Sequence, residues 1–176
     1  QEQYEAFASV VRAFEGDPVT LRTFDIGGDK FASSFQLPPE MNPALGLRAI
    51  RLALAEPEVF LVQLRAMVRA AAHGPVRVMI PMVSTTTELI QAKALLRQAE
   101  AEVALKNRSH VPPLPLGAMI EVPAAAVMAD ILARYADFFS LGTNDLVQYA
   151  LAVDRSSRTL AHLASALDPA ILRLIS

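Results

Sequence analysis

The sequence contains no cysteine. Disulfides, thiolate metal sites and catalysis by a thiol are therefore excluded within this chain. No apolar run reaches the roughly 18 residues that a membrane-spanning helix needs. The first residues, QEQYEAFASV, also lack the basic and apolar regions of a signal peptide. We therefore expect a cytoplasmic protein that does not enter a membrane.

An excess of positive charge is also missing. The net charge is −2 and the pI is about 5.9, so the chain has no overall positive field for a nucleic acid or an anionic membrane. Of the 16 basic residues, 13 are arginines and only Lys30, Lys93 and Lys106 are lysines. The planar arginine fork suits carboxylates and phosphates, although a GC-rich genome would give the same bias.

Several catalytic motifs do not occur. The sequence has no phosphate loop of the G-x-x-x-x-G-K-[ST] type, no G-x-G-x-x-G and no nucleophile elbow. The paired glycines of "DIGGDK" are more typical of a tight turn where a strand ends. His73, His110 and His162 lack the spacing of metal ligands, so we expect structural or surface roles for them.

What is present is a globular composition, 53% hydrophobic over 176 residues, in which strands and helices alternate. Short apolar runs predict four strands, in "PVTLRTFDIGGDK", "VRVMIPM", "PLGAMIE" and "DFFSLG". Helical patterns are expected over residues 3–15, 42–55, 57–74, 84–106, 123–136 and 143–153, with a last helix from residue 168. Ser84 is expected to cap the long helix over 84–106, with Glu88 in its first turn. This alternation predicts an α/β fold with a parallel sheet covered by helices.

Polar side chains collect where the expected strands end. The first strand carries Arg22 and Asp25, the third ends at Glu121, and the fourth is followed by Asn144 and Asp145. Adjacent parallel strands lie about 4.8 Å apart, so carboxylates that close neighbouring strands can reach one small cation. Alone, Asp145 would be only a helix-dipole partner and Glu121 a surface residue. As a pair, they predict a Mg²⁺ site.

Arginines provide the complementary charge. Arg22 lies in a β-like run, where a buried charge needs a partner. Arg48 and Arg51 share one face of an expected helix, which more often means a solvated face, and Arg155 would otherwise pair with Asp154 or the helix dipole. Together with a Mg²⁺ pair, guanidinium groups near one rim would suit a small phosphate ester with several negative charges.

Five blocks carry a family resemblance: "LRTFDIGGDK", "NPALGLRAIR", "MIPMVS", "IEVPAAA" and "FFSLGTNDLVQYALAVDR". In this order they resemble the phosphoenolpyruvate-binding domain of enzyme I of the bacterial sugar phosphotransferase system, the phosphoenolpyruvate-protein phosphotransferases. That domain is a (β/α)₈ barrel that binds phosphoenolpyruvate and Mg²⁺ and usually forms a homodimer. The resemblance implies that residues 1–176 are an incomplete barrel domain without an internal boundary, containing about four of the eight strands.

The resemblance also implies roles for individual residues. Arg22, Arg48 and Arg155 would bind the substrate phosphate and carboxylate and act in catalysis, while Asn144 and Lys30 would add substrate contacts. Glu121 and Asp145 would hold Mg²⁺, and Asp145 would also lie at the substrate. The parent enzyme would pass the phosphoryl group to a protein histidine and then to a phosphocarrier protein for sugar uptake.

Some parts of the family pattern are missing from this chain. These are a G-M-C-G-E motif with a proton-donating cysteine, an R-T-E-F motif with another arginine, and a separate domain with the acceptor histidine in a G-G-x-x-S-H context. We therefore expect no transferase activity from this chain alone, and self-association through open strand edges. Two alternatives remain open: a non-catalytic dimerisation or ligand-sensing fragment, or a piece of a pyruvate phosphate dikinase or phosphoenolpyruvate synthase.

Overall fold

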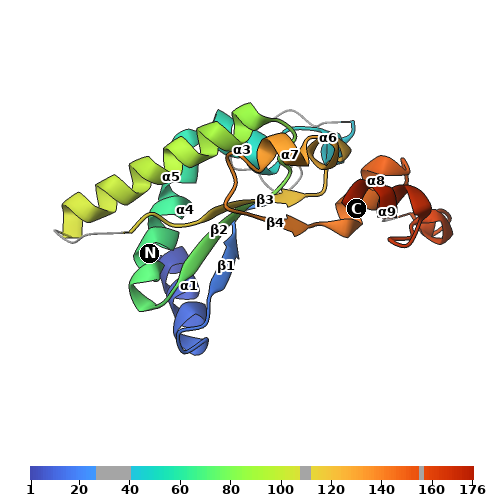
Figure 1. Ribbon diagram of the computed structural model, residues 1–176. Coiled ribbons are helices and arrows are strands. Elements are labelled where there is room, and N and C mark those ends of the chain that lie inside the picture. Colours follow the sequence, from blue (N-terminus) through green and yellow to red (C-terminus); the bar gives the residue numbers. More distant parts are fainter. Residues whose placement is uncertain (27–40, 108–111, 155–156) are drawn as a thin grey trace.

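The protein is an α/β structure built around one parallel sheet. The computed structural model describes residues 1–26, 41–107, 112–154 and 157–176. Four strands pair in the order β1 (Val19–Arg22), β2 (Val76–Ile80), β3 (Leu116–Ile120) and β4 (Phe138–Leu141), and all neighbours are parallel. They curl into a half-barrel (Figure 1). The α/β fold and the four parallel strands predicted from the sequence are therefore confirmed.

Helices cover one face of this sheet. The described helices are α1 (Glu2–Ala13), α3 (Ala49–Ala55), α4 (Pro57–Ala70), α5 (Thr86–Asn107), α6 (Pro123–Val127), α7 (Ala129–Leu132), α8 (Thr143–Ala150) and α9 (Pro169–Ile175), with short 3₁₀ turns at Pro43–Leu45 (η1), Ala71–His73 (η2) and Ala161–Leu163 (η3). In Figure 1, α8 and α9 lie beyond the carboxyl end of β4, whereas α1 lies toward the opposite end of the sheet. None of the described helices is long and apolar enough to cross a bilayer.

The hydrophobic core lies between the sheet and the covering helices. Phe60, Leu61 and Leu64 of α4 are fully buried against strand residues such as Val78 and Leu116. All five residues of β3 are buried, and in β2 only Arg77 is exposed. The pattern differs in β4, which alternates between half-buried and exposed residues.

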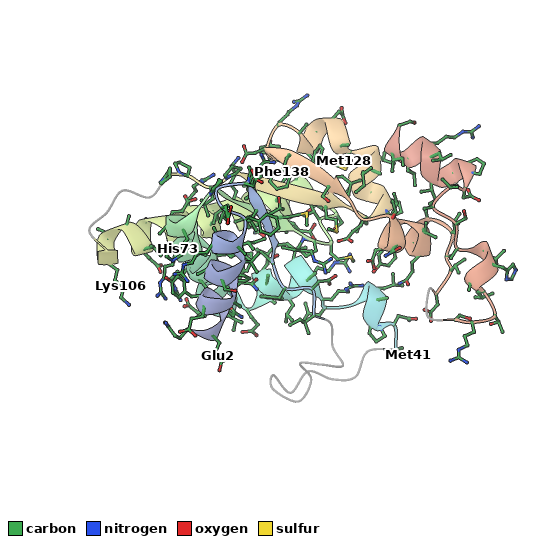
Figure 2. The ribbon with its side chains drawn as sticks, turned by 90° about the horizontal axis from the view of Figure 1, so that it is seen from below. Glu2, Met41, His73, Lys106, Met128 and Phe138 are labelled. Atoms are coloured by element: carbon green, nitrogen blue, oxygen red, sulfur yellow. The ribbon has the colours of Figure 1, made fainter. Side chains whose placement is uncertain are left out.

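The amino-terminal helix is fixed at the end of the sheet opposite to α8. The ring nitrogen Nε2 of His73 lies 3.0 Å from the Tyr4 hydroxyl and 2.8 Å from an Arg12 nitrogen. Figure 2 labels His73 and Glu2, the first residue of α1. A Cβ on Gly74 would lie 2.9 Å from Val11, so the chain passes close to α1 there. These contacts agree with the structural role that the sequence indicates for His73.

The helix boundaries include two corrections. The helix predicted over residues 42–55 is broken, because η1 ends at Leu45 and α3 begins at Ala49. The helix predicted over 123–136 is also interrupted, at Met128 between α6 and α7.

The start of α5 gives a smaller correction. Thr85, not Ser84, is the capping residue: its hydroxyl accepts the Glu88 amide at 3.2 Å, and the Glu88 carboxylate accepts the amides of Ser84 and Thr85 at 2.8 Å. This reciprocal pair is a capping box, and Glu88 takes the first-turn position that the sequence predicts.

Candidate functional site

Two carboxylates follow neighbouring strands at one rim of the sheet. Ile120 of β3 is in register with Leu141 of β4, and Glu121 comes directly after Ile120. The chain turns from β4 through Gly142 into α8, whose first turn carries Asn144 and Asp145. Pairing of β3 with β4 thus places Glu121 beside the start of α8. Glu121 is 1% exposed and Asp145 is 6% exposed, so both are removed from bulk water.

The Glu121 side chain connects the ends of three strands. One carboxylate oxygen accepts the Met82 amide at 2.7 Å, just after β2. The other lies against Gly142, where an added Cβ would be only 2.6 Å away. Met82 itself has a left-handed backbone with φ 60°, a strained conformation for a residue with a side chain. The carboxylate therefore has a fixed position at the rim.

The pKa of Glu121 depends on its burial and on the charges around it. Burial raises the pKa of Glu121 from 4.5 to about 7, and the Met82 amide acts in the opposite direction. The negative charges of Asp145 and Asp25 raise the pKa further, whereas the positive charge of Arg22 lowers it. Charged groups from β1, α8 and the turn after β1 therefore lie close enough to act on the Glu121 carboxyl group.

Arg48 lies at the centre of this group of charges. Its Nη2 donates to both carboxylate oxygens of Asp25 at 2.8 Å, and its Nε donates to Asp25 at 3.1 Å. Nη1 lies 3.5 Å from Oδ1 of Asp145. The side chains of Arg48, Asp25 and Asp145 are only 9–11% exposed, so solvent screens these ion pairs weakly.

The position of Arg48 corrects the sequence interpretation. Arg48 does not share a helix face with Arg51, because Arg48 is the extended N-cap residue before α3, with φ −137° and ψ 165°. Ala49, the next residue, is left-handed with φ 49°. Arg51 donates instead to the carbonyls of Leu45 and Gly46, which closes the turn between η1 and α3. The helix breaks where Arg48 turns toward Asp25.

Tyr149 joins the same group, although the sequence analysis did not single it out. Its hydroxyl accepts from Arg48 Nη1 at 3.1 Å and donates to the carbonyl of Ala44. Burial raises the pKa of this hydroxyl above its ordinary value, so it remains a proton donor. The spacing of Asp145 and Tyr149, four residues apart on α8, is the signal that could have identified it.

The remaining predicted residues lie at different places. Arg22, the last residue of β1, is exposed and is in register with Met79 of β2. Asn144 is exposed in the first turn of α8. Lys30 and Arg155 lie outside the described residues.

The two carboxylates at the rim are too few to hold a metal ion by protein ligands alone, but they are compatible with Mg²⁺. Within residues 1–26, 41–107, 112–154 and 157–176, no group of three His, Asp or Glu side chains is arranged to hold a metal ion. Mg²⁺ commonly takes one or two carboxylates and completes its octahedron with water and substrate oxygens. Glu121 and Asp145, buried and near enough for the charge of one to shift the pKa of the other, fit that requirement.

The family model and the curated relatives agree on one family. Residues 1–176 match the family described as PEP-utilising enzyme, PEP-binding domain, where PEP is phosphoenolpyruvate. A phosphoenolpyruvate-protein phosphotransferase of Staphylococcus aureus is 49% identical over 177 residues, which cover 99% of this chain and 31% of the relative. The protein of the same name from Staphylococcus carnosus is 48% identical over 175 residues, covering 99% and 30%.

Among solved structures, a citrate lyase from Burkholderia xenovorans matches with a TM-score of 0.49 and 19% identity, over 65% of this chain and 34% of that chain. The chain spans about 31% of the length of the curated relatives that it matches.

Proposed function

Because the chain belongs to the PEP-binding domain family of PEP-utilising enzymes, we propose that it binds phosphoenolpyruvate together with Mg²⁺ at the rim formed by Glu121, Asp145 and Arg48. The observation that supports this proposal best is the Arg48 guanidinium, held by Asp25 and next to Asp145, in a nearly buried position. A buried arginine beside carboxylates provides both the anion partner and the metal partners that a phosphate ester with Mg²⁺ needs.

We assign the substrate contacts by charge. Arg48 and Arg22 bind the phosphate and carboxylate groups, and Asn144 donates hydrogen bonds from the first turn of α8. Lys30 and Arg155 are carried over from the motifs "DIGGDK" and "LAVDR" as further cationic contacts.

Glu121 and Asp145 are the proposed Mg²⁺ ligands. When bound, Mg²⁺ supplies neutralisation of the negative charge on the phosphate oxygens. Glu121 is fixed by the Met82 amide and Asp145 by its place on α8, so the ligand pair needs little rearrangement. Arg48, already oriented by Asp25, stabilises charge on the transferring group without reorganisation at the moment of reaction.

For the longer protein we propose a phosphotransferase. A histidine on another domain attacks the phosphorus in line, the bond between phosphorus and the enol oxygen breaks, and the enolpyruvate then takes a proton to become pyruvate. The phosphohistidine passes its phosphoryl group to a phosphocarrier protein in sugar uptake. We also propose that the intact protein is a homodimer.

We propose that the chain by itself binds phosphoenolpyruvate but does not transfer the phosphoryl group. It contains no cysteine to act as the proton donor of its family and no G-G-x-x-S-H motif with an acceptor histidine. Incubation with labelled phosphoenolpyruvate and phosphocarrier protein should therefore leave the carrier unlabelled. Label on the carrier would contradict this part of the proposal.

Calorimetry tests the binding function directly. Titration of phosphoenolpyruvate into the chain with Mg²⁺ should give saturable binding that Arg48→Ala abolishes. Arg65→Ala is the matched control, because Arg65 pairs with Glu102 on the helical side, away from the rim. If neither the chain nor its control binds phosphoenolpyruvate, the proposal fails and a scaffold role is favoured.

A further inference from the structure

The Tyr149 hydroxyl lies between two segments that are far apart in the sequence. It accepts a hydrogen bond from Arg48 Nη1 at 3.1 Å, donates one to the carbonyl of Ala44, and lies 3.8 Å from the sulfur of Met82. One side chain of α8 therefore touches the turn before α3 and the residue whose amide holds Glu121.

The direction of these hydrogen bonds is fixed by chemistry. A carbonyl oxygen can only accept, so the Tyr149 proton must point to Ala44. The lone pairs of the hydroxyl are then left for Arg48 Nη1, which can only donate. The donor of each hydrogen bond is therefore defined: Arg48 donates to the Tyr149 hydroxyl, and this hydroxyl donates to the Ala44 carbonyl.

All three nitrogens of the guanidinium have a protein acceptor. Asp25 takes Nε and Nη2, and Tyr149 takes Nη1. Asp25 holds the Nε–Nη2 edge of the planar guanidinium, and Nη1 projects from the other side of the group, 3.5 Å from Oδ1 of Asp145. The Tyr149 hydroxyl, at 3.1 Å, is the nearer partner of Nη1, so the guanidinium is held from two sides.

We infer that Tyr149 is a positioning residue: its hydroxyl supports the side of the Arg48 guanidinium that Asp25 does not hold, and so fixes the orientation of the whole group toward the substrate anion. This inference rests on the proposed function, because it needs Arg48 to bind the anion. An arginine side chain carries about 2 kcal/mol of rotamer entropy, and a group that is oriented before binding loses less of its freedom when the ligand arrives. Tyr149 acts through Arg48 and touches no substrate atom.

The first test uses the ligand-free chain and Tyr149→Phe, which keeps the ring and removes only the hydroxyl. Nitrogen-15 NMR of the arginine guanidinium groups should show slow rotation and separate Nη signals for Arg48 in the original chain. In Tyr149→Phe these signals should merge, and exchange of the Arg48 Nε proton should become about tenfold faster. Tyr135→Phe is the control, because Tyr135 follows α7 on the helical side. An unchanged melting temperature shows that the fold is intact.

The second test measures phosphoenolpyruvate affinity with Mg²⁺ by calorimetry. Tyr149→Phe should weaken binding about tenfold, which corresponds to 1.4 kcal/mol, and Tyr135→Phe should not. Identical NMR signals and identical affinity in Tyr149→Phe would overturn the inference even if Arg48→Ala abolishes binding. If the original chain does not bind phosphoenolpyruvate, the proposed function fails, and the NMR result alone decides whether Tyr149 positions Arg48.

Discussion

Glu121 carries a carboxyl group into a position that is 1% exposed, and this should make stability depend on pH. Its ordinary pKa of 4.5 applies to the unfolded chain, and folding raises the pKa to about 7, mainly through burial. The folded state therefore binds the proton more tightly. This contribution to stability is complete below about pH 4.5 and is lost as the pH rises through 7.

Glu121→Gln isolates this effect, because the glutamine side chain stays neutral at every pH. Its carbonyl oxygen can still accept a hydrogen bond from the backbone amide of Met82. Without Mg²⁺, the two proteins should have similar free energies of unfolding at pH 4.5, and the variant should be more stable at pH 8 by up to roughly 3 kcal/mol. Urea unfolding at several pH values measures the difference. If the difference in free energy of unfolding between the two proteins does not change with pH, folding does not raise the pKa of Glu121.

Arg48 should not tolerate exchange for lysine. Lysine keeps the charge but cannot donate from three nitrogens to Asp25 and Tyr149 together. Arg48→Lys should weaken phosphoenolpyruvate binding by roughly 1.5–3 kcal/mol, the range for hydrogen bonds to charged groups. The same exchange at Arg65, whose side chain is 33% exposed, should have no effect in a binding titration. Equal losses at both positions would mean that only total charge matters.

Some individual residues of the site can be predicted from the sequence, and others cannot. Glu121 and Asp145 could be found because each lies within a few residues of the end of an apolar run. Asp25 was noted on the first strand, but its pairing with Arg48 could not be foreseen, because residues 42–55 were expected to be one helix. Tyr149 was missed because a tyrosine on an amphipathic helix is usually a core residue.

At the scale of elements, the junction between β4 and α8 should be sensitive to small changes. A Cβ on Gly142 would lie 2.6 Å from the Glu121 carboxylate and 2.9 Å from the sulfur of Met119. The backbone of Gly142 has φ −98°, which alanine accepts, so any effect comes from lack of space. Gly142→Ala should displace the Glu121 carboxylate and weaken Mg²⁺-dependent binding several-fold.

Gly117→Ala is the comparison for this junction. A Cβ there would lie 2.5 Å from the Phe138 ring, so the substitution should lower the melting temperature by disturbing β3 and β4. It does not touch the Glu121 carboxylate. Measuring melting temperature and binding for both variants separates the two effects. A binding loss in Gly117→Ala as large as in Gly142→Ala would argue against a specific contact at Gly142.

Strands were predicted more accurately than helix interruptions. β2 and β3 are compact runs of mostly buried apolar residues, so the local sequence already indicates them. The break at Gly46–Arg48 has only the glycine as a local signal, and the break at Met128 has none. The first depends on an ion pair with Asp25, 23 residues earlier in the chain, so it is a tertiary effect that overrides helix propensity.

For the whole molecule, the open edges of the half-barrel should determine its behaviour in solution. Within the described sheet, β1 and β4 each pair with a strand on one side only. Phe139 and Leu141 of β4 are 37% and 51% exposed. Unpaired edges with apolar side chains favour pairing between molecules. We expect concentration-dependent self-association in analytical ultracentrifugation, reduced by Phe139→Lys. A monomer at all concentrations would contradict this expectation.

We propose that Glu121, Asp145 and Arg48 form one site in which a divalent cation and a phosphate ester bind together. The most direct measurement is titration of phosphoenolpyruvate with Mg²⁺ and with a chelator, using the original chain and Asp145→Asn. Mg²⁺ should strengthen phosphoenolpyruvate binding to the original chain by at least about tenfold and should have little effect on the variant. Equal affinity with and without Mg²⁺, or the same gain in Asp145→Asn, would contradict the proposal.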